Sequence, residues 1–404
     1  MQLHVDSIAW IVFAAFVALI VTTFVFPKVL WFAKKHNIMD NPNARKLQRT
    51  PIPVLGGIAV YIGILMGFLV LAYYYMAPVI LLSLVAITVM QVLGIWDDVS
   101  ELSTWFRFCV ESVLVGALLW ALGMHIDSFH GLWGIQQIDG TVAVVLSVVA
   151  GVGIINAVNM IDGVDGYVSG FCMQACLCFS ILFLMVGEYV MAGMALVVMA
   201  SLLPFFLHNV FGVRSKMFIG DGGTMMLGIL VVIFVFLTLS SKSKCSVLEN
   251  RNVGLVAFAL AVMCIPVFDT LRVMTLRILR GYSPFQSDKT HLHHLFIEMG
   301  FSHLGAALSI VLLNQTIILI WLLLWRMGVS IESQTYAVVL MGLAVTFGFY
   351  KLMKCQQFGG RLDENGNPQG TSLWHFFCKL GDMSHIEKGR IWRSIRRLID
   401  NRWW

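Results

Sequence analysis

The sequence predicts an all-α fold, a polytopic integral membrane protein with about 11 transmembrane helices. Its composition supports this. Of the 404 residues 59% are hydrophobic and only 12% are charged, whereas soluble domains average about 45–50% and about 25%. The hydrophobic residues also fall into runs of about 20, the length that crosses a bilayer as a helix. The same figures exclude a disordered chain, a collagen-like chain and a disulfide-rich secreted scaffold.

Eleven apolar runs are the candidate spans, in chain order 8–30, 55–75, 79–96, 106–122, 141–160, 167–186, 189–211, 224–240, 254–275, 304–325 and 336–353. The first run has no basic segment before it and no small-residue cleavage site, so we expect a retained anchor rather than a signal peptide. Three of the eight cysteines, Cys172, Cys176 and Cys178, share one run without the paired spacing of a zinc site. We expect them to be small buried hydrophobic residues.

Charge orients the predicted bundle, because Lys and Arg gather on the cytoplasmic side of a membrane. With a periplasmic N-terminus, all but four of the 27 Lys and Arg residues fall on the cytoplasmic side. We therefore expect a cytoplasmic C-terminus, with residues 1–353 forming a multi-span domain and residues 354–404 a basic cytoplasmic tail against anionic lipid. Basic residues spread among apolar spans do not indicate nucleic-acid binding.

Five aspartates stand beside the predicted spans. Asp97 and Asp98 end the third run, Asp162 and Asp165 follow the fifth, and Asp221 lies between the seventh and the eighth. In the predicted orientation all five share the cytoplasmic face, and acids beside a membrane segment are costly and usually functional. Alone, each group has a simpler explanation, such as a solvated helix end or a glycine-rich anion nest at residues 220–223. Together they predict a bound cation.

The cation that we expect is Mg²⁺, with Mn²⁺ as the alternative. Hard carboxylate oxygens favour it, and Mg²⁺ keeps several waters and bridges to substrate phosphates. Zinc is the weaker interpretation. His291 and His294 share a helical face, but no Cys or Glu stands at the spacing of a zinc protease.

Basic groups are expected on the same side as the acids. Arg272, Arg277 and Arg280 precede a histidine group, His291, His293 and His294. Positive-inside topology accounts for the arginines but not for the histidines, and partly protonated imidazoles beside guanidinium groups suit a diphosphate. Two further acids are expected in intrahelical ion pairs, Glu111 with Arg107 and Asp269 with Arg272.

Five ordered motifs between about Asp40 and Gly300 carry a family resemblance. They are Pro53-Val-Leu-Gly56-Gly57, Asp97-Asp98, Asn156-Ala-Val-Asn159-Met-Ile-Asp162-Gly-Val-Asp165-Gly, Phe218-Ile-Gly-Asp221-Gly and His291-Leu-His293-His294. This set resembles the polyprenyl-phosphate N-acetylhexosamine-1-phosphate transferases.

The resemblance implies transfer of a sugar 1-phosphate from a UDP-sugar to undecaprenyl phosphate with release of UMP. By motif it implies catalytic roles for Asp97, Asp98, Asp162, Asp165, His291, His293 and His294, substrate contacts from Asn159, Gly163, Asn209, Phe218, Arg272, Arg277, Arg280 and Arg49, and Mg²⁺ ligation by Asp221, Asp97 and Asp98.

The spacing of the histidines resembles the branch that uses UDP-N-acetylglucosamine, so this is the expected donor. Another UDP-N-acetylhexosamine and a UDP-MurNAc-pentapeptide are the alternatives. The resemblance also implies the bacterial inner membrane, an active site facing the cytoplasm, and initiation of a lipid-linked cell-surface polysaccharide such as the O-antigen of lipopolysaccharide. The oligomeric state stays open, with a homodimer as one alternative.

The reaction exchanges one phosphoanhydride for another, so catalysis can consist mainly of positioning and charge neutralisation. We expect a direct attack of the lipid phosphate on the β-phosphorus, with Asp98 or Asp97 orienting the nucleophile or taking a residual proton. A two-step route through an aspartyl phosphate is the rival. A transporter of a phosphorylated ligand is the alternative class, although transporters place their charges near the bilayer midplane rather than at one face.

Overall fold

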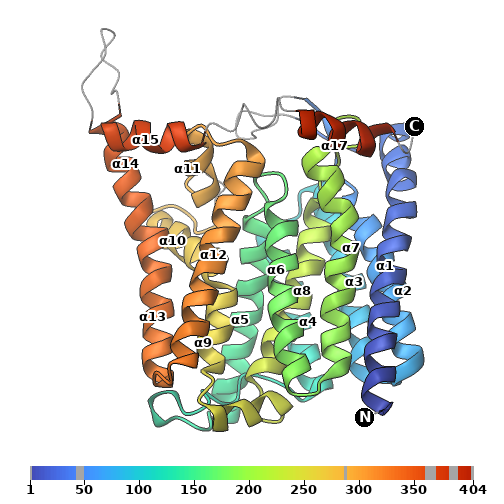
Figure 1. Ribbon diagram of the computed structural model, residues 1–404, viewed down its shortest axis with the longest axis vertical. Coiled ribbons are helices and arrows are strands. Elements are labelled where there is room, and N and C mark those ends of the chain that lie inside the picture. The colour runs from blue at the N-terminus through green and yellow to red at the C-terminus, as the bar shows by residue number, and fades with distance from the viewer. Residues whose placement is uncertain (1, 42–49, 286–288, 360–369, 382–389, 402–404) are drawn as a thin grey trace.

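The computed structural model describes residues 2–41, 50–285, 289–359, 370–381 and 390–401. These residues form a bundle of long helices standing side by side (Figure 1), together with one two-stranded ribbon. The elements in chain order are α1 (Gln2–Lys35), β1 (Met39–Asp40), β2 (Ile52–Pro53), α2 (Gly56–Tyr75), α3 (Pro78–Ser100), α4 (Thr104–Leu122), η1 (Leu132–Gly134), α5 (Gly140–Met160), α6 (Tyr167–Met185), α7 (Tyr189–Phe211), α8 (Gly220–Leu239), η2 (Lys244–Arg251), α9 (Leu255–Val262), α10 (Cys264–Leu279), α11 (Leu292–Glu298), α12 (His303–Arg326), α13 (Ile331–Leu343), the π-helix η3 (Ala344–Phe349), α14 (Tyr350–Phe358), α15 (Ser372–Gly381) and α17 (Arg390–Asn401).

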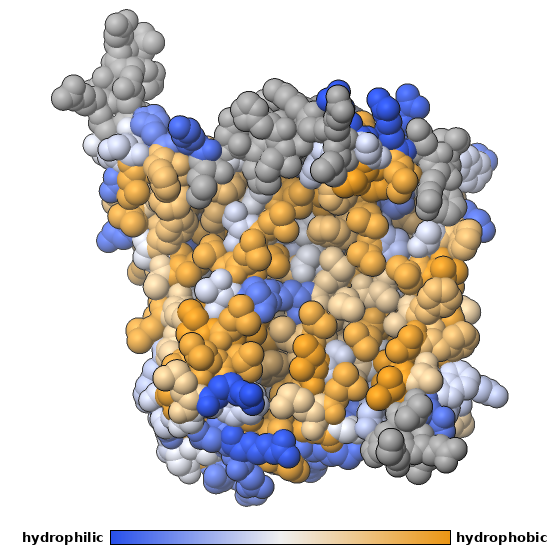
Figure 2. Space-filling view, in the orientation of Figure 1, coloured by the Kyte–Doolittle hydropathy of each residue, from blue (hydrophilic) through white to orange (hydrophobic). Residues whose placement is uncertain are grey.

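The predicted fold class is confirmed. In the described part of the chain, 10 helices are long and apolar enough to cross a membrane, or 11 if the bent pair η2 and α9 counts as one span. The visible face is mostly hydrophobic across its middle, and hydrophilic residues gather toward its two ends (Figure 2). Helix α1 begins at one end of the bundle, and α17 lies at the other (Figure 1).

Helix α8 forms the centre of the bundle. Its whole 18-residue apolar window is buried, as expected for a helix that is hydrophobic on every side. Glycines let its neighbours approach closely. A Cβ on Gly57 of α2 would lie 2.6 Å from the Gly223 Cα, and one on Gly94 of α3 would lie 2.3 Å from the Gly222 nitrogen. Two glycines of the predicted anion nest therefore serve helix packing, as small residues commonly do in membranes.

The ninth predicted span, 254–275, is not one continuous helix. It breaks at Met263 into α9 and α10. Pro266 has no N–H to donate to the Val262 carbonyl four residues before it, and Asn314 of α12 replaces the lost bonds. Its Nδ2 donates to the Val262 oxygen at 3.0 Å, and its Oδ1 accepts from the Ile265 N–H at 3.0 Å. The tertiary contact with α12 thus stabilises a break that apolar periodicity could not reveal.

The helix ends that carry the predicted motifs meet at one end of the bundle. Successive spans alternate in direction, so the C-terminal ends of α1, α3, α5 and α7 lie beside the N-terminal ends of α4, α6, α8 and α12. The short helices α11, α15 and α17 lie at this same end (Figure 1). The ribbon pairs Asp40 with Ile52 and so brings the segment after α1 to this end as well.

Candidate active site

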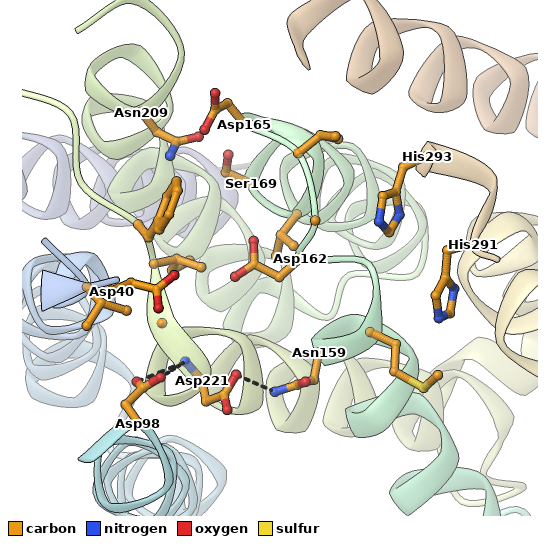
Figure 3. A pocket seen from close by; sticks show the side chains of 18 of the residues that line it. Asp40, Asp98, Asn159, Asp162, Asp165, Ser169, Asn209, Asp221, His291 and His293 are labelled. Atoms are coloured by element: carbon orange, nitrogen blue, oxygen red, sulfur yellow. Dashed lines mark hydrogen bonds between the residues drawn. The ribbon is translucent and has the colours of Figure 1, made fainter. Parts of the chain in front are cut away.

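A cavity of about 650 Å³ opens between these helix ends. Twelve of the residues expected from the sequence line it, although they come from separate segments between positions 98 and 294. They are Asp98, Asn159, Asp162, Gly163, Asp165, Asn209, Phe218, Asp221, Arg277, His291, His293 and His294. Figure 3 shows the carboxylates of Asp98, Asp162 and Asp221 grouped in this pocket, with the imidazoles of His291 and His293 across from them.

Asp221 lies in the first turn of α8, where a negative charge is favoured by the helix dipole. Its own N–H donates to both oxygens of Asp98, at 3.2 and 3.0 Å, and its Oδ1 accepts from Asn159 Nδ2 at 3.1 Å (Figure 3). Gly220 makes this turn possible with a φ of +75°. The amide of Asp221 therefore binds a side chain of the same protein rather than contributing to an open anion nest.

Asp97 lies next to Asp221 but does not line the cavity. Its carboxylate accepts from Arg107 Nη1 at 2.5 Å and from the Leu102 N–H at 2.8 Å, and it is not among the lining residues. The tight turn between α3 and α4 brings Arg107 back over the end of α3. The predicted pair between Arg107 and Glu111 is therefore wrong, and Glu111 instead accepts from Asn156 Nδ2 at 2.6 Å.

The loop between α5 and α6 carries Asp162 and Asp165, whose pKa values are shifted in opposite directions. Burial in the cavity is the main cause that raises the pKa of Asp162 to about 7, and the nearby carboxylates of Asp221, Asp165 and Asp40 act in the same direction. Burial also acts to raise the pKa of Asp165, but the hydrogen bond from His303 and the charge of Lys216 outweigh it and lower that pKa. Lys216 Nζ lies 2.5 Å and His303 Nδ1 lies 3.0 Å from Asp165 Oδ2.

Asp269 of α10 connects the histidine group to a buried arginine. It accepts from Arg272 Nη2 at 2.7 Å, which confirms the predicted intrahelical pair, and from His291 Nδ1 at 2.9 Å. The Arg272 guanidinium also lies 3.8 Å from the centre of the Tyr350 ring. Arg272 is fully buried in this network and does not line the cavity, so it orients His291 rather than reaching a substrate.

The environment of His293 favours the neutral imidazole, whereas the sequence suggested partly protonated histidines. Burial is the main cause that lowers the pKa of His293 well below the usual range, and the neighbouring His294 and His291 act in the same direction. Its ring fills the space beside Gly163, because a Cβ on that glycine would lie 2.0 Å from His293 Nε2. The glycine therefore lets the loop after α5 pack directly against this imidazole.

Other expected substrate contacts differ in their placement. Phe218 lines the cavity, whereas the amide of Asn209 is engaged on both sides, accepting from the Gly166 N–H at 2.7 Å and donating to the Met217 oxygen at 3.0 Å. Arg280, near the end of α10, is exposed outside the cavity. Arg49 lies outside the described residues.

Sequence reasoning missed several residues at the cavity. They are Asp40, Glu101, Arg107, Asn156, Ser169, Phe285 and His303. Asp40 and Glu101 follow predicted spans on the same side as the five aspartates, so the same acid-beside-span signal identifies them. No pattern in the sequence places Ser169 or Phe285 there.

The donor chemistry of the cavity suits a hard divalent cation. Six carboxylates line it, against two guanidinium groups, Arg107 and Arg277. Among the residues that the structure describes, no three His, Cys, Asp or Glu side chains are close enough together to hold a metal ion by themselves. Such a set fits Mg²⁺, which takes one or two protein carboxylates and completes its shell with water and phosphate, better than a zinc site closed by protein ligands.

Comparison with known proteins gives a consistent result. The sequence model of glycosyl transferase family 4 matches residues 79–239. The undecaprenyl-phosphate alpha-N-acetylglucosaminyl 1-phosphate transferase of Escherichia coli K12 is 30% identical over 302 residues, covering 72% of this chain and 79% of that protein. A probable undecaprenyl-phosphate N-acetylglucosaminyl 1-phosphate transferase of Bacillus subtilis 168 is 30% identical over 305 residues, covering 75% and 82%.

Proposed function

Since this chain belongs to the undecaprenyl-phosphate N-acetylglucosaminyl 1-phosphate transferases of glycosyl transferase family 4, we propose that it transfers N-acetylglucosamine 1-phosphate from UDP-N-acetylglucosamine to undecaprenyl phosphate and releases UMP. The observation that carries the proposal is the cavity at the helix ends, where the carboxylates of Asp98, Asp162 and Asp221 lie opposite His291 and His293. A water-soluble donor and a lipid acceptor can meet only where bilayer and water adjoin.

The proposed reaction is a direct displacement. An oxygen of the lipid phosphate forms a bond to the β-phosphorus of the donor, while the bond from that phosphorus to the bridging oxygen breaks and UMP leaves. The second pKa of a phosphate monoester is about 6, so the nucleophile is already largely dianionic at pH 7. Asp98, fixed by the Asp221 amide, orients this phosphate or takes its residual proton. Asp97 forms an ion pair with Arg107 and so holds the Arg107 guanidinium at the cavity.

The main barrier is the repulsion between two anionic reactants. Arg107 and Arg277 line the cavity, and their positive charges reduce this repulsion. His291, whose Nδ1 donates to Asp269, can also donate to the diphosphate from Nε2 when the imidazole is protonated. The residues suited to hold Mg²⁺ are Asp221 and Asp98. When bound, Mg²⁺ supplies positive charge that offsets the negative charge of the diphosphate.

We further propose that the protein lies in the bacterial inner membrane with the cavity facing the cytoplasm, where UDP-sugars are available. It would there perform the first lipid-linked step of a cell-surface polysaccharide. The charge distribution supports this orientation, since the residues near the cavity end include most of the lysines and arginines.

The test is turnover by the purified protein in detergent or nanodiscs with labelled UDP-N-acetylglucosamine, undecaprenyl phosphate and Mg²⁺. We expect labelled lipid and UMP in equal amounts, and loss of both on chelation with EDTA. Asp221→Asn should lower the rate by about 100-fold or more. Asp139→Asn is the matched control, because Asp139 caps α5 at the opposite end and asparagine caps equally well. If the parent protein releases no UMP, it is not a transferase. A transporter of a phosphorylated ligand would give this result.

Competition among UDP-N-acetylglucosamine, UDP-N-acetylgalactosamine and UDP-MurNAc-pentapeptide identifies the donor. Exchange of labelled UMP into UDP-N-acetylglucosamine without lipid would contradict the direct displacement, because only a covalent enzyme intermediate permits it.

A further inference from the structure

We propose that Asp400, in the C-terminal helix α17, is a positioning residue that holds the segment between α7 and α8 in the shape required for nucleotide-sugar binding. This inference rests on the proposed function. Helix α17 lies across the cavity end of the bundle (Figure 1), far in sequence from the segment that it touches.

The contact is a carboxylate enclosed by consecutive backbone amides. Asp400 Oδ1 accepts from the N–H groups of Val213, Arg214 and Ser215, each at 3.2 Å, and from the Ser215 hydroxyl at 2.9 Å. Three successive N–H groups converging on one anion form a nest, and hydrogen bonds to an ionised acceptor are stronger than neutral ones. This is the densest set of bonds to one carboxylate outside the cavity in the described chain.

The packing of α17 against the bundle places this carboxylate next to residues 213–215. Trp392 and Ile399 are each only 8% exposed, and the Trp392 ring lies 4.8 Å from that of Phe211 at the end of α7. Arg393 and Arg397 are exposed on the outer face. The apolar face thus fixes the helix on α7, and Asp400 is placed next to the following loop.

The inner side of the same segment forms part of the cavity wall and its support. Lys216, next in sequence after the three amides, pairs with Asp165, and Met217 accepts from Asn209. Phe218 follows and lines the cavity. The segment is therefore held by Asp400 and by Lys34, whose Nζ donates to the Arg214 oxygen at 2.7 Å, and by Asp165 and Asn209 on its inner side. We expect loss of the Asp400 contacts to loosen residues 213–215 and, through them, to displace Lys216 and the residue that follows the Met217 contact, Phe218.

We expect the consequence to fall on donor binding more than on the chemical step, because Asp400 bonds to residues 213–215, whereas Asp221 lies in the first turn of α8 and its own amide binds Asp98. In the purified full-length protein we expect Asp400→Ala to raise the KM for UDP-N-acetylglucosamine about tenfold and to leave kcat within about twofold. Asp400→Asn keeps the shape and one acceptor oxygen, so it should recover most of the loss. Arg397→Gln, on the exposed face of the same helix, is the matched control and should equal the parent.

A double-mutant cycle separates positioning from general destabilisation. If Asp400 acts through the segment that carries Lys216, Asp400→Ala should have little further effect on KM in a Lys216→Ala background, because directly coupled residues are not additive. If the effects of the two substitutions on KM multiply, the residues act independently and the inference is overturned. It is also overturned if Asp400→Ala lowers kcat at unchanged KM, or if its KM equals that of the parent.

A binding measurement distinguishes this inference from the proposed function. Titration of UMP into the purified parent should give saturable binding that Asp400→Ala weakens and Asp400→Asn largely keeps. A parent that neither binds UMP nor turns over contradicts the transferase itself. A parent that binds and turns over, with Asp400→Ala identical to it, contradicts only the role of Asp400. If Asp400→Ala does not fold, Ser215→Ala, which removes the hydroxyl's bonds to Asp400 and to His208 but leaves the three amides in place, should still raise KM measurably, and an unchanged KM would count against the inference.

Discussion

At the scale of single residues, Gly163 shows how tightly the cavity wall is packed. A Cβ there would lie 2.0 Å from His293 Nε2, and His293 is buried with its ring stacked 5.6 Å from that of His291. We expect Gly163→Ala to displace the histidine group and to lower activity by about 100-fold, since a shift of about 1 Å can cost this much. Gly170→Ala is the control, because its Cβ would meet only ordinary contacts at 3.7 Å or more. Equal activities of the two variants would contradict this packing argument.

The ion pair of Asp165 makes a pH-dependent contribution to stability. Its folded-state pKa is lowered, so its stabilising effect is present above the ordinary carboxylate pKa of about 3.9 and is lost as the pH falls toward the lowered value. We expect Asp165→Asn to reduce the free energy of unfolding by about 1–3 kcal/mol at neutral pH. Thermal unfolding in detergent from pH 8 to pH 3.5 should show a constant gap from the parent that narrows only below about pH 4. A gap that widens in acid would refute the assignment.

At the scale of elements, Asn314 stabilises the break between α9 and α10. Asn314→Leu keeps the approximate volume but leaves the Val262 carbonyl and the Ile265 N–H unpaired in an apolar interior, at about 1–3 kcal/mol for each group. Because α10 carries Asp269 and Arg277, activity should fall together with the unfolding temperature. Thr316→Val on the same helix is the control, since Thr316 bonds only within α12. If both variants unfold at the same temperature, the break is held by packing alone.

The elements also show which boundaries apolar periodicity can place. The predicted seventh span, 189–211, matches α7 at both ends, and α2 and α6 differ from prediction by one residue at one end. Helix α8 starts four residues earlier than predicted, at Gly220, because a glycine-rich polar turn can still be helical when Asn159 and Asp98 satisfy its polar groups. Asp221 thereby becomes part of a rigid helix rather than a loop.

At the scale of the whole molecule, the distribution of charge predicts orientation. Fluorescent-protein and alkaline-phosphatase fusions test it, since the first fluoresces only in the cytoplasm and the second is active only in the periplasm. We expect fluorescence from a fusion after Trp404 and phosphatase activity from an insertion near Lys244. The reverse pattern would place the cavity on the periplasmic side, away from UDP-sugars, and would contradict the proposed function.

The sequence by itself determined the membrane class, about 11 spans and the set of acids and histidines beside them, because these depend on local composition and on spacing along the chain. It also identified the Asp269–Arg272 pair, which lies within one helix turn. These features require no knowledge of which helices are neighbours.

Only the tertiary structure decided how those residues divide between substrate and support. Asp97 and Asp98 are adjacent in sequence, yet Asp97 pairs with Arg107 while Asp98 faces the cavity. Arg272 is withdrawn into a network with Asp269 and Tyr350, and Asp400 reaches a loop about 185 residues away. A side chain's partner across a helix interface depends on the crossing angle of the helices, on the rotation of each helix about its axis and on where a helix breaks. These properties arise from packing among several helices, so the sequence of any one helix carries no periodic signal for them.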